Sequence, residues 1–130
     1  MTPMNAFAEW VALQETEALP GRAPATLSDE TAKRIEKLAD QLDPEPVAIN
    51  LAAALRLLWT AIAEASEEIP TDALCGTLWH LFESAELVVD LIHAEGDARY
   101  FVHGHALAKA EQAKQSKPAT RRKKAKEANA

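Results

Sequence analysis

The chain has 130 residues, 48% of them hydrophobic, and a net charge of −6. This length suits one domain, and the apolar fraction is enough for a core, which excludes a collagen-like, coiled low-complexity or fully disordered chain. There are 27 alanines and 15 leucines but only 5 valines and 5 isoleucines. Alanine and leucine enter helices at little cost, whereas the scarce β-branched residues favour strands, so the composition predicts an all-α fold.

The charge is divided unevenly along the chain. Residues 1–108 hold 6 basic and 18 acidic side chains, a net charge of −12, whereas residues 109–130 hold 8 basic and 2 acidic side chains, a net charge of +6. We therefore divide the chain into an acidic helical domain over 1–108 and a basic tail over 109–130. The segment 116–120, which contains Pro118, is expected to break any helix. Nothing beyond it can bury itself, so we expect disorder from about residue 116 onward.

Three features bear on where the protein works. The first ten residues show no basic stretch followed by an apolar one, so no secretory signal is predicted. The longest charge-free apolar runs, 47–55 and 73–82, are about half as long as the roughly 20 residues that a membrane-spanning helix needs. Cys75 has no second cysteine to pair with, and its apolar neighbours predict burial. We expect a cytoplasmic protein with no membrane span.

Prolines at 3, 20, 24, 44, 46, 70 and 118 separate the expected helices. The first helix, over 4–18, has a loose apolar side. The second, over about 28–42, places Ile35, Leu38 and Leu42 on one stripe and charged side chains on the other. Ser28, or Thr26 with Asp29, supplies its start.

Two long helices are expected next, over about 44–68 and 72–95. The dipeptide Asp43-Pro44 is typical of a helix start, and Gly96 is typical of a helix end. Because the two helices are joined by only a few residues, they are expected to pack as an antiparallel hairpin. A kinked or frayed fifth helix is expected after Gly96.

The predicted architecture is a small helical bundle in which the first two helices cover this hairpin. It can close as a four-helix bundle within one chain, or two hairpins can pair in a homodimer. The predicted core consists of apolar side chains of the hairpin: Leu51, Leu55, Leu58, Ile62, Leu74, Leu78, Leu81, Phe82, Val88 and Ile92.

Residues with catalytic or metal-binding chemistry are few. His93, His103 and His105 have a spacing that is not typical of a metal site, because side chains two apart on a helix diverge. His80 is expected to be exposed, and Cys75 has no base at helical spacing. We therefore predict no enzyme, no cofactor and no metal site, and a histidine-dependent metal protein is a weaker alternative.

The hairpin is expected to carry a partner surface. Leu57, Leu87 and Leu91 project from otherwise polar sides of the two long helices, and Leu87 and Leu91 are one turn apart. Such a ridge suits association with a protein partner or a second copy. Glu83 and Asp90 lie beside it in the acidic surface.

The tail is expected to contact anions. Lys117, Arg121, Arg122, Lys123, Lys124 and Lys126 can neutralise phosphates of a nucleic acid without sequence preference, since no aromatic side chain is present to stack on bases. A membrane surface, an acidic protein and a passive solubilising tail are alternatives. The sequence thus predicts a non-enzymatic interaction or regulatory protein. The alternative is an acidic inhibitor that blocks a basic nucleic-acid-binding surface of another protein.

Overall fold

The computed structural model describes the backbone of residues 1–128 and the side chains of residues 1–116. Within this part of the chain every regular element is helical, which confirms the predicted all-α class. The elements are α1 (Pro3–Thr16), the 3-10 helix η1 (Pro24–Thr26), α2 (Asp29–Gln41), α3 (Glu45–Glu64) and α4 (Thr71–Ala128).

Local capping explains where the first helices begin and end. The Thr2 hydroxyl accepts a hydrogen bond from the backbone N–H of Asn5, and the Ser28 hydroxyl accepts one from the N–H of Thr31 at 3.1 Å. Helix α1 ends where Ala18 adopts a positive φ of 48°, a conformation more typical of glycine. This turn lets the N–H of Leu19 bond to the carbonyl of Gln14 and directs the Leu19 side chain into the core.

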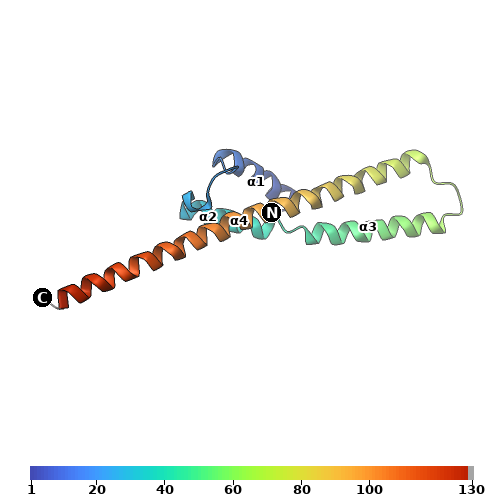
Figure 1. Cartoon of the computed structure of the whole chain (residues 1–130). Coiled ribbons are helices and arrows are strands. Elements are labelled where there is room, and N and C mark those ends of the chain that lie inside the picture. The colour runs from blue at the N-terminus through green and yellow to red at the C-terminus, as the bar shows by residue number, and fades with distance from the viewer. Residues whose placement is uncertain (129–130) are drawn as a thin grey trace.

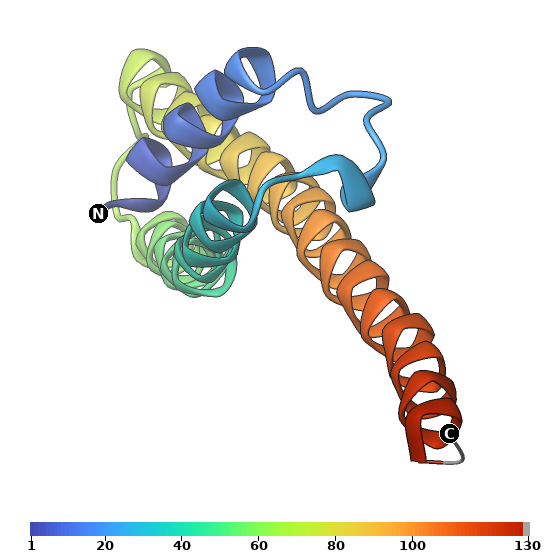
Figure 2. The ribbon, with the colours of Figure 1, turned by 90° about the vertical axis from the view of Figure 1, so that its left-hand side faces the viewer.

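The buried core lies where α1, η1 and α2 cover the middle of α4 (Figures 1 and 2). Fully buried side chains come from α1 (Trp10, Leu13), from α2 (Ile35, Leu38) and from α4 (Leu91, Ala98). We call α1, η1, α2 and residues 91–109 of α4 the packed half. Three ion pairs tie its helices together, and they join Arg34 to Glu9, Arg99 to Asp40 and Lys109 to Asp29.

The remaining described helices form an extension of the packed half, which we call the arm (α3 and residues 71–90 of α4). Figure 1 shows α3 leading away from the packed half and α4 returning past it after the connection at 65–70. No residue of α3 is buried. The arm therefore makes contact between its two helices without enclosing a core.

This arrangement corrects the predicted core. Of the ten predicted core residues none is buried: Leu51, Leu58, Leu74, Leu81 and Val88 are half-buried, and Leu55, Ile62, Leu78, Phe82 and Ile92 are exposed. The physical reason is that α1 and α2 do not reach along the arm. They pack against α4 beyond residue 87, so each arm helix has one neighbour rather than two or three.

Helix α4 also differs from the prediction. It continues through Gly96, where a helix end and then a separate fifth helix were expected. The side chains of Leu91, Ala94, Ala98 and Phe101 are buried against α1 and α2 on both sides of Gly96. This packing outweighs the roughly 1 kcal/mol by which glycine disfavours a helix.

Gly104 has a different role in α4, because Pro24 of η1 packs against the helix there. A Cβ atom at position 104 would lie 2.7 Å from Cβ and Cγ of Pro24. The absence of a side chain thus allows the proline ring to rest directly on α4.

The backbone of α4 remains helical to Ala128, including residues 116–120, where a break was expected. Alanine, lysine, arginine, glutamate and glutamine are strong helix formers, which favours this continuation. Pro118 has no N–H to bond to the carbonyl of Lys114, so the helix loses one hydrogen bond at this turn.

Candidate interaction surface

Large apolar side chains are exposed along the arm. Trp59 is 73% exposed and Phe82 is 54% exposed, although both belong to side-chain types that normally dominate cores and interfaces. The other exposed apolar side chains of the arm include Leu55, Leu57, Ile62, Leu78, Trp79 and Val89. The rings of Trp79 and Phe82 contact each other, with their centroids 5.9 Å apart. Exposed apolar groups of this number and continuity are typical of an interaction surface.

Many of these side chains follow a regular spacing. On α3 the row runs through 48, 52, 55, 59 and 62, and on α4 it runs through 78, 82, 85, 89, 92 and 96. Both rows alternate steps of four and three residues, which is the spacing of a coiled-coil seam. A second set with seven-residue spacing, Leu74, Leu81 and Val88, is half-buried, as expected for a stripe covered by the neighbouring helix α3.

The predicted leucine ridge does not exist as a surface feature. Leu91 has no exposed surface and belongs to the buried cluster, and Leu87 is half-buried and packs against that cluster. Both side chains point toward α1 and α2, so the side of α4 that the sequence marked as polar is covered at this level. Leu57 is 73% exposed, as expected, but it stands apart from the other two leucines.

The predicted acidic residues are on the surface of the arm. Glu83 and Asp90 are both exposed, and a carboxylate oxygen of Glu83 lies 3.9 Å from Nδ1 of His80. Asp90 and Phe82 border a shallow hollow that also includes Ala85, Glu86 and Val89.

Cys75 is exposed, which corrects the expected burial: it lies on the arm, where no further helix covers it.

The histidines do not converge. His93 and His103 are exposed, whereas His105 is half-buried and its Nε2 lies 3.0 Å from Oδ1 of Asp29. Within the described residues no group of three potential metal ligands is found. The Nδ1 atom of His105 is buried and has no hydrogen-bond partner among the described atoms.

Asp29 is the centre of this contact between α2 and α4. Its Oδ2 lies 2.8 Å from Nζ of Lys109, and Oδ1 meets His105. Hydrogen bonds from Lys109 and then His105 lower the pKa of Asp29 below the ordinary 3.8. The group is best explained as a structural clamp, because the carboxylate is occupied by two side chains that fix α2 against α4.

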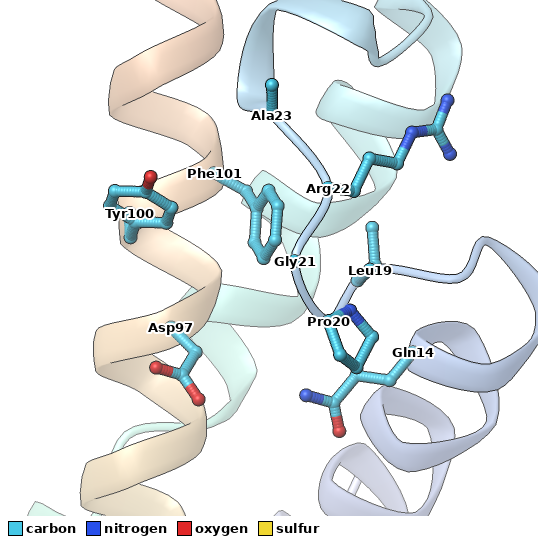
Figure 3. Close-up of a pocket in the computed structure, with 9 residues that line it drawn as sticks. All are labelled: Gln14, Leu19, Pro20, Gly21, Arg22, Ala23, Asp97, Tyr100 and Phe101. Atoms are coloured by element: carbon cyan, nitrogen blue, oxygen red, sulfur yellow. The ribbon is translucent and has the colours of Figure 1, made fainter.

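A cavity of about 460 Å³ lies between the loop after α1 and α4 (Figure 3). Its walls are formed by the loop residues 19–23 together with Gln14, Asp97, Tyr100 and Phe101. The guanidinium of Arg22 points away from Asp97 and Tyr100 in Figure 3 and donates hydrogen bonds to the carbonyls of Glu17 and Thr26. No nucleophile with an adjacent base is found among the residues that line this cavity.

The range Asp29–Glu64, which covers α2 and α3, contains a segment that is long and apolar enough to cross a membrane by length and composition alone. None of that segment is buried within the structure. Helix α3 supplies its apolar part, and it carries Arg56 near its middle. The exposure of this segment adds to the evidence that the arm has an apolar surface to cover.

The side chains of the predicted anion-binding residues, from Lys117 to Lys126, lie outside the described side chains, so their contact with anions stays a prediction.

Comparisons of the chain with protein-family models, with curated proteins and with solved structures found no match.

Proposed function

We propose that this protein is a non-enzymatic interaction or regulatory protein of the cytoplasm, which binds a protein partner through an antiparallel hairpin formed by α3 and α4. The basic tail adds nonspecific contacts with nucleic acid or another anion. The observation that carries this proposal is the exposure of Trp59, Phe82 and their apolar neighbours along the arm.

Physical chemistry supports a partner for this surface. Each square ångström of apolar surface removed from water contributes about 25 cal/mol, so covering one exposed aromatic side chain favours association by a few kcal/mol. The same side chains contribute nothing to the fold while they face water. The packed half already has its own core and ion pairs, so it does not need the arm to fold back onto it.

Affinity capture with the full chain tests the role of the arm. Phe82→Glu places a charge in the apolar row, whereas Ile49→Glu makes the same kind of change at an exposed position outside both rows. We expect a partner that co-purifies with the wild type and with Ile49→Glu to be lost with Phe82→Glu. Equal recovery of every partner by all three proteins would contradict the proposal.

Binding to a short DNA duplex tests the role of the tail. If all six predicted basic residues contact phosphates, affinity falls roughly a thousandfold between 50 and 200 mM salt. A chain ending at residue 116 should lose this binding, and duplexes of unrelated sequence should bind the wild type equally. Duplex binding that survives the truncation would rule out the tail as the anion site.

The alternative function, inhibition of a basic nucleic-acid-binding protein, predicts a different result. Glu83 and Asp90 are exposed on the arm and are available to a basic surface. In that case Glu83→Gln with Asp90→Asn weakens capture of the partner, and removal of the tail does not. Phe82→Glu, which adds negative charge, would then leave capture intact or strengthen it.

A further inference from the structure

We propose that the occupant of the arm's apolar face is a second copy of this chain, which lays its own arm against the first to form a four-helix bundle. This inference rests on the proposed function, because it names the partner of the same surface. We define the apolar face as the row 48–62 of α3 together with the row 78–96 of α4, which continues from the arm into the start of the packed half.

The two rows lie on one side of the arm. At 100° per residue, each row is turned by about 70 to 90° from the stripe that faces the neighbouring helix. In α3 that inner stripe contains Leu51 and Leu58, and in α4 it contains Leu81 and Val88. Because the two helices run in opposite directions, these turns bring the rows to the same broad side. The contacts of Leu91 and Ala98 with α1 and α2 occupy nearly the opposite side of α4, so the packed half leaves this face open.

The shape of the face suits a copy of itself. Large side chains gather near the 65–70 connection, where Trp59, Ile62, Leu78 and Phe82 lie. Toward the packed half the row of α3 becomes small, with Ala48 and Ala52, whereas the row of α4 has Val89 and Ile92 between Ala85 and Gly96. A two-fold axis perpendicular to the arm places the end of each face that carries Trp59 over the alanine end of the other copy. A self-complementary patch of this kind is what a closed two-fold dimer requires.

The exposed area is also sufficient. The face includes seven large apolar side chains that are 42 to 73% exposed: Leu55, Trp59, Ile62, Leu78, Phe82, Val89 and Ile92. With roughly 150 to 250 Å² for a whole aromatic side chain and somewhat less for an aliphatic one, they expose on the order of 700 Å². A standard stable interface covers about 800 Å² on each partner. Two interlocking rows of alternating spacing are also the surface that one half of a four-helix bundle presents to the other half.

Charge argues against a lipid bilayer as the occupant. Between residues 45 and 90 the chain has eight acidic residues and one basic residue, Arg56. Insertion of the arm would bring Glu83, Glu86 and Asp90 to an apolar or anionic surface, which is unfavourable. Between two copies these carboxylates remain at the wet rim. Salt screens their mutual repulsion, so dimer formation should strengthen as salt rises, opposite to the binding of the tail to DNA.

Sedimentation equilibrium of the full chain tests the inference. We expect a concentration-dependent mass that approaches twice the chain mass of 14.2 kDa, with a dissociation constant that falls as salt rises. Phe82→Glu should raise that constant about a hundredfold or more, as expected when a charge replaces a large aromatic side chain that the interface covers. Ile49→Glu, outside both rows, should leave it unchanged. Helical content by circular dichroism checks each variant, and Val89→Glu replaces Phe82→Glu if the latter loses its helices.

The measured mass distinguishes the possible occupants of the apolar face. A wild-type protein that stays at one chain mass up to high concentration excludes a second copy as the occupant. A dimer that neither Phe82→Glu nor Val89→Glu weakens excludes the apolar face as the dimer interface. A bilayer is the occupant instead if the protein is monomeric in solution and sediments with vesicles of neutral and anionic lipids. Phe82→Glu should then abolish the sedimentation with vesicles. A monomer that still captures another protein through the row refutes only this inference, because the proposed function then stands.

Discussion

The packed half and the arm are built from the same kinds of residues but have opposite relations to water. Trp10 on α1 is 2% exposed, whereas Trp59 on α3 is 73% exposed. In the packed half, α1 and α2 cover α4, and ion pairs join the helices. In the arm, the described ion pair of His80 with Glu83 lies within one helix. Helical periodicity alone therefore does not decide burial; the number of neighbouring helices at each level does.

The largest expected difference between the two regions comes from matched tryptophan substitutions. Trp10→Ala removes a buried aromatic side chain and should reduce the free energy of unfolding by about 3 to 5 kcal/mol. Trp59→Ala should change it by less than about 0.5 kcal/mol when measured on dilute, monomeric protein. Urea unfolding followed by circular dichroism gives both values. Similar losses for the two variants would break the distinction between the packed half and the arm.

A matched pair of glycines should give a smaller effect, with opposite signs. Gly104→Ala forces a methyl group against the rigid ring of Pro24, which should cost about 1 to 3 kcal/mol of stability. Gly96→Ala meets no atom within 4 Å and should stabilise the same helix by up to about 1 kcal/mol.

Thermal unfolding of the two glycine variants beside the wild type measures these shifts. A stabilising Gly104→Ala would show that η1 does not rest on α4. A destabilising Gly96→Ala would show that α4 needs a break at this position, as the sequence suggested.

The sequence was sufficient for the helical class and for most helix starts, because these depend on local chemistry. Ser28 caps α2, and the proline-containing segment around Asp43 opens α3, where Asp43 accepts a hydrogen bond from the N–H of Glu45. These contacts reach only two or three residues along the chain. Helix starts are therefore determined by residues that are adjacent in the sequence.

The core could not be predicted in the same way. Leu78 and Leu91 have similar patterns around them, yet one is exposed and the other is buried. Periodicity marks apolar positions on several sides of α4, and only the placement of α1 and α2 decides which of them are buried. The row 48–62 of α3 and the row 78–96 of α4 were visible in the sequence as alternating steps of four and three residues. Treating these rows as separate from the stripe between the two helices would have found the apolar face.

The smallest expected effect concerns the clamp between α2 and α4. Because Lys109 and His105 lower the pKa of Asp29 in the folded protein, its carboxylate contributes stability above its unfolded pKa of 3.8. That contribution is lost as the pH falls through the lower, folded value. Asp29→Asn should therefore be less stable than the wild type above about pH 5, and the difference should shrink below about pH 4.

Urea unfolding between pH 2 and 7 measures the contribution of Asp29, and Glu30→Gln is the matched control in the same helical turn. The control should give a difference from the wild type that changes less with pH, because its carboxylate is outside the contact with His105 and Lys109. The side chain of Asp29 is largely exposed, so high salt should reduce its effect by screening. Parallel pH curves for Asp29→Asn and the wild type would mean that the ion pair does not hold α2 on α4. The electrostatic contribution to the packed half would then come from the other two ion pairs between its helices, Arg34 with Glu9 and Arg99 with Asp40.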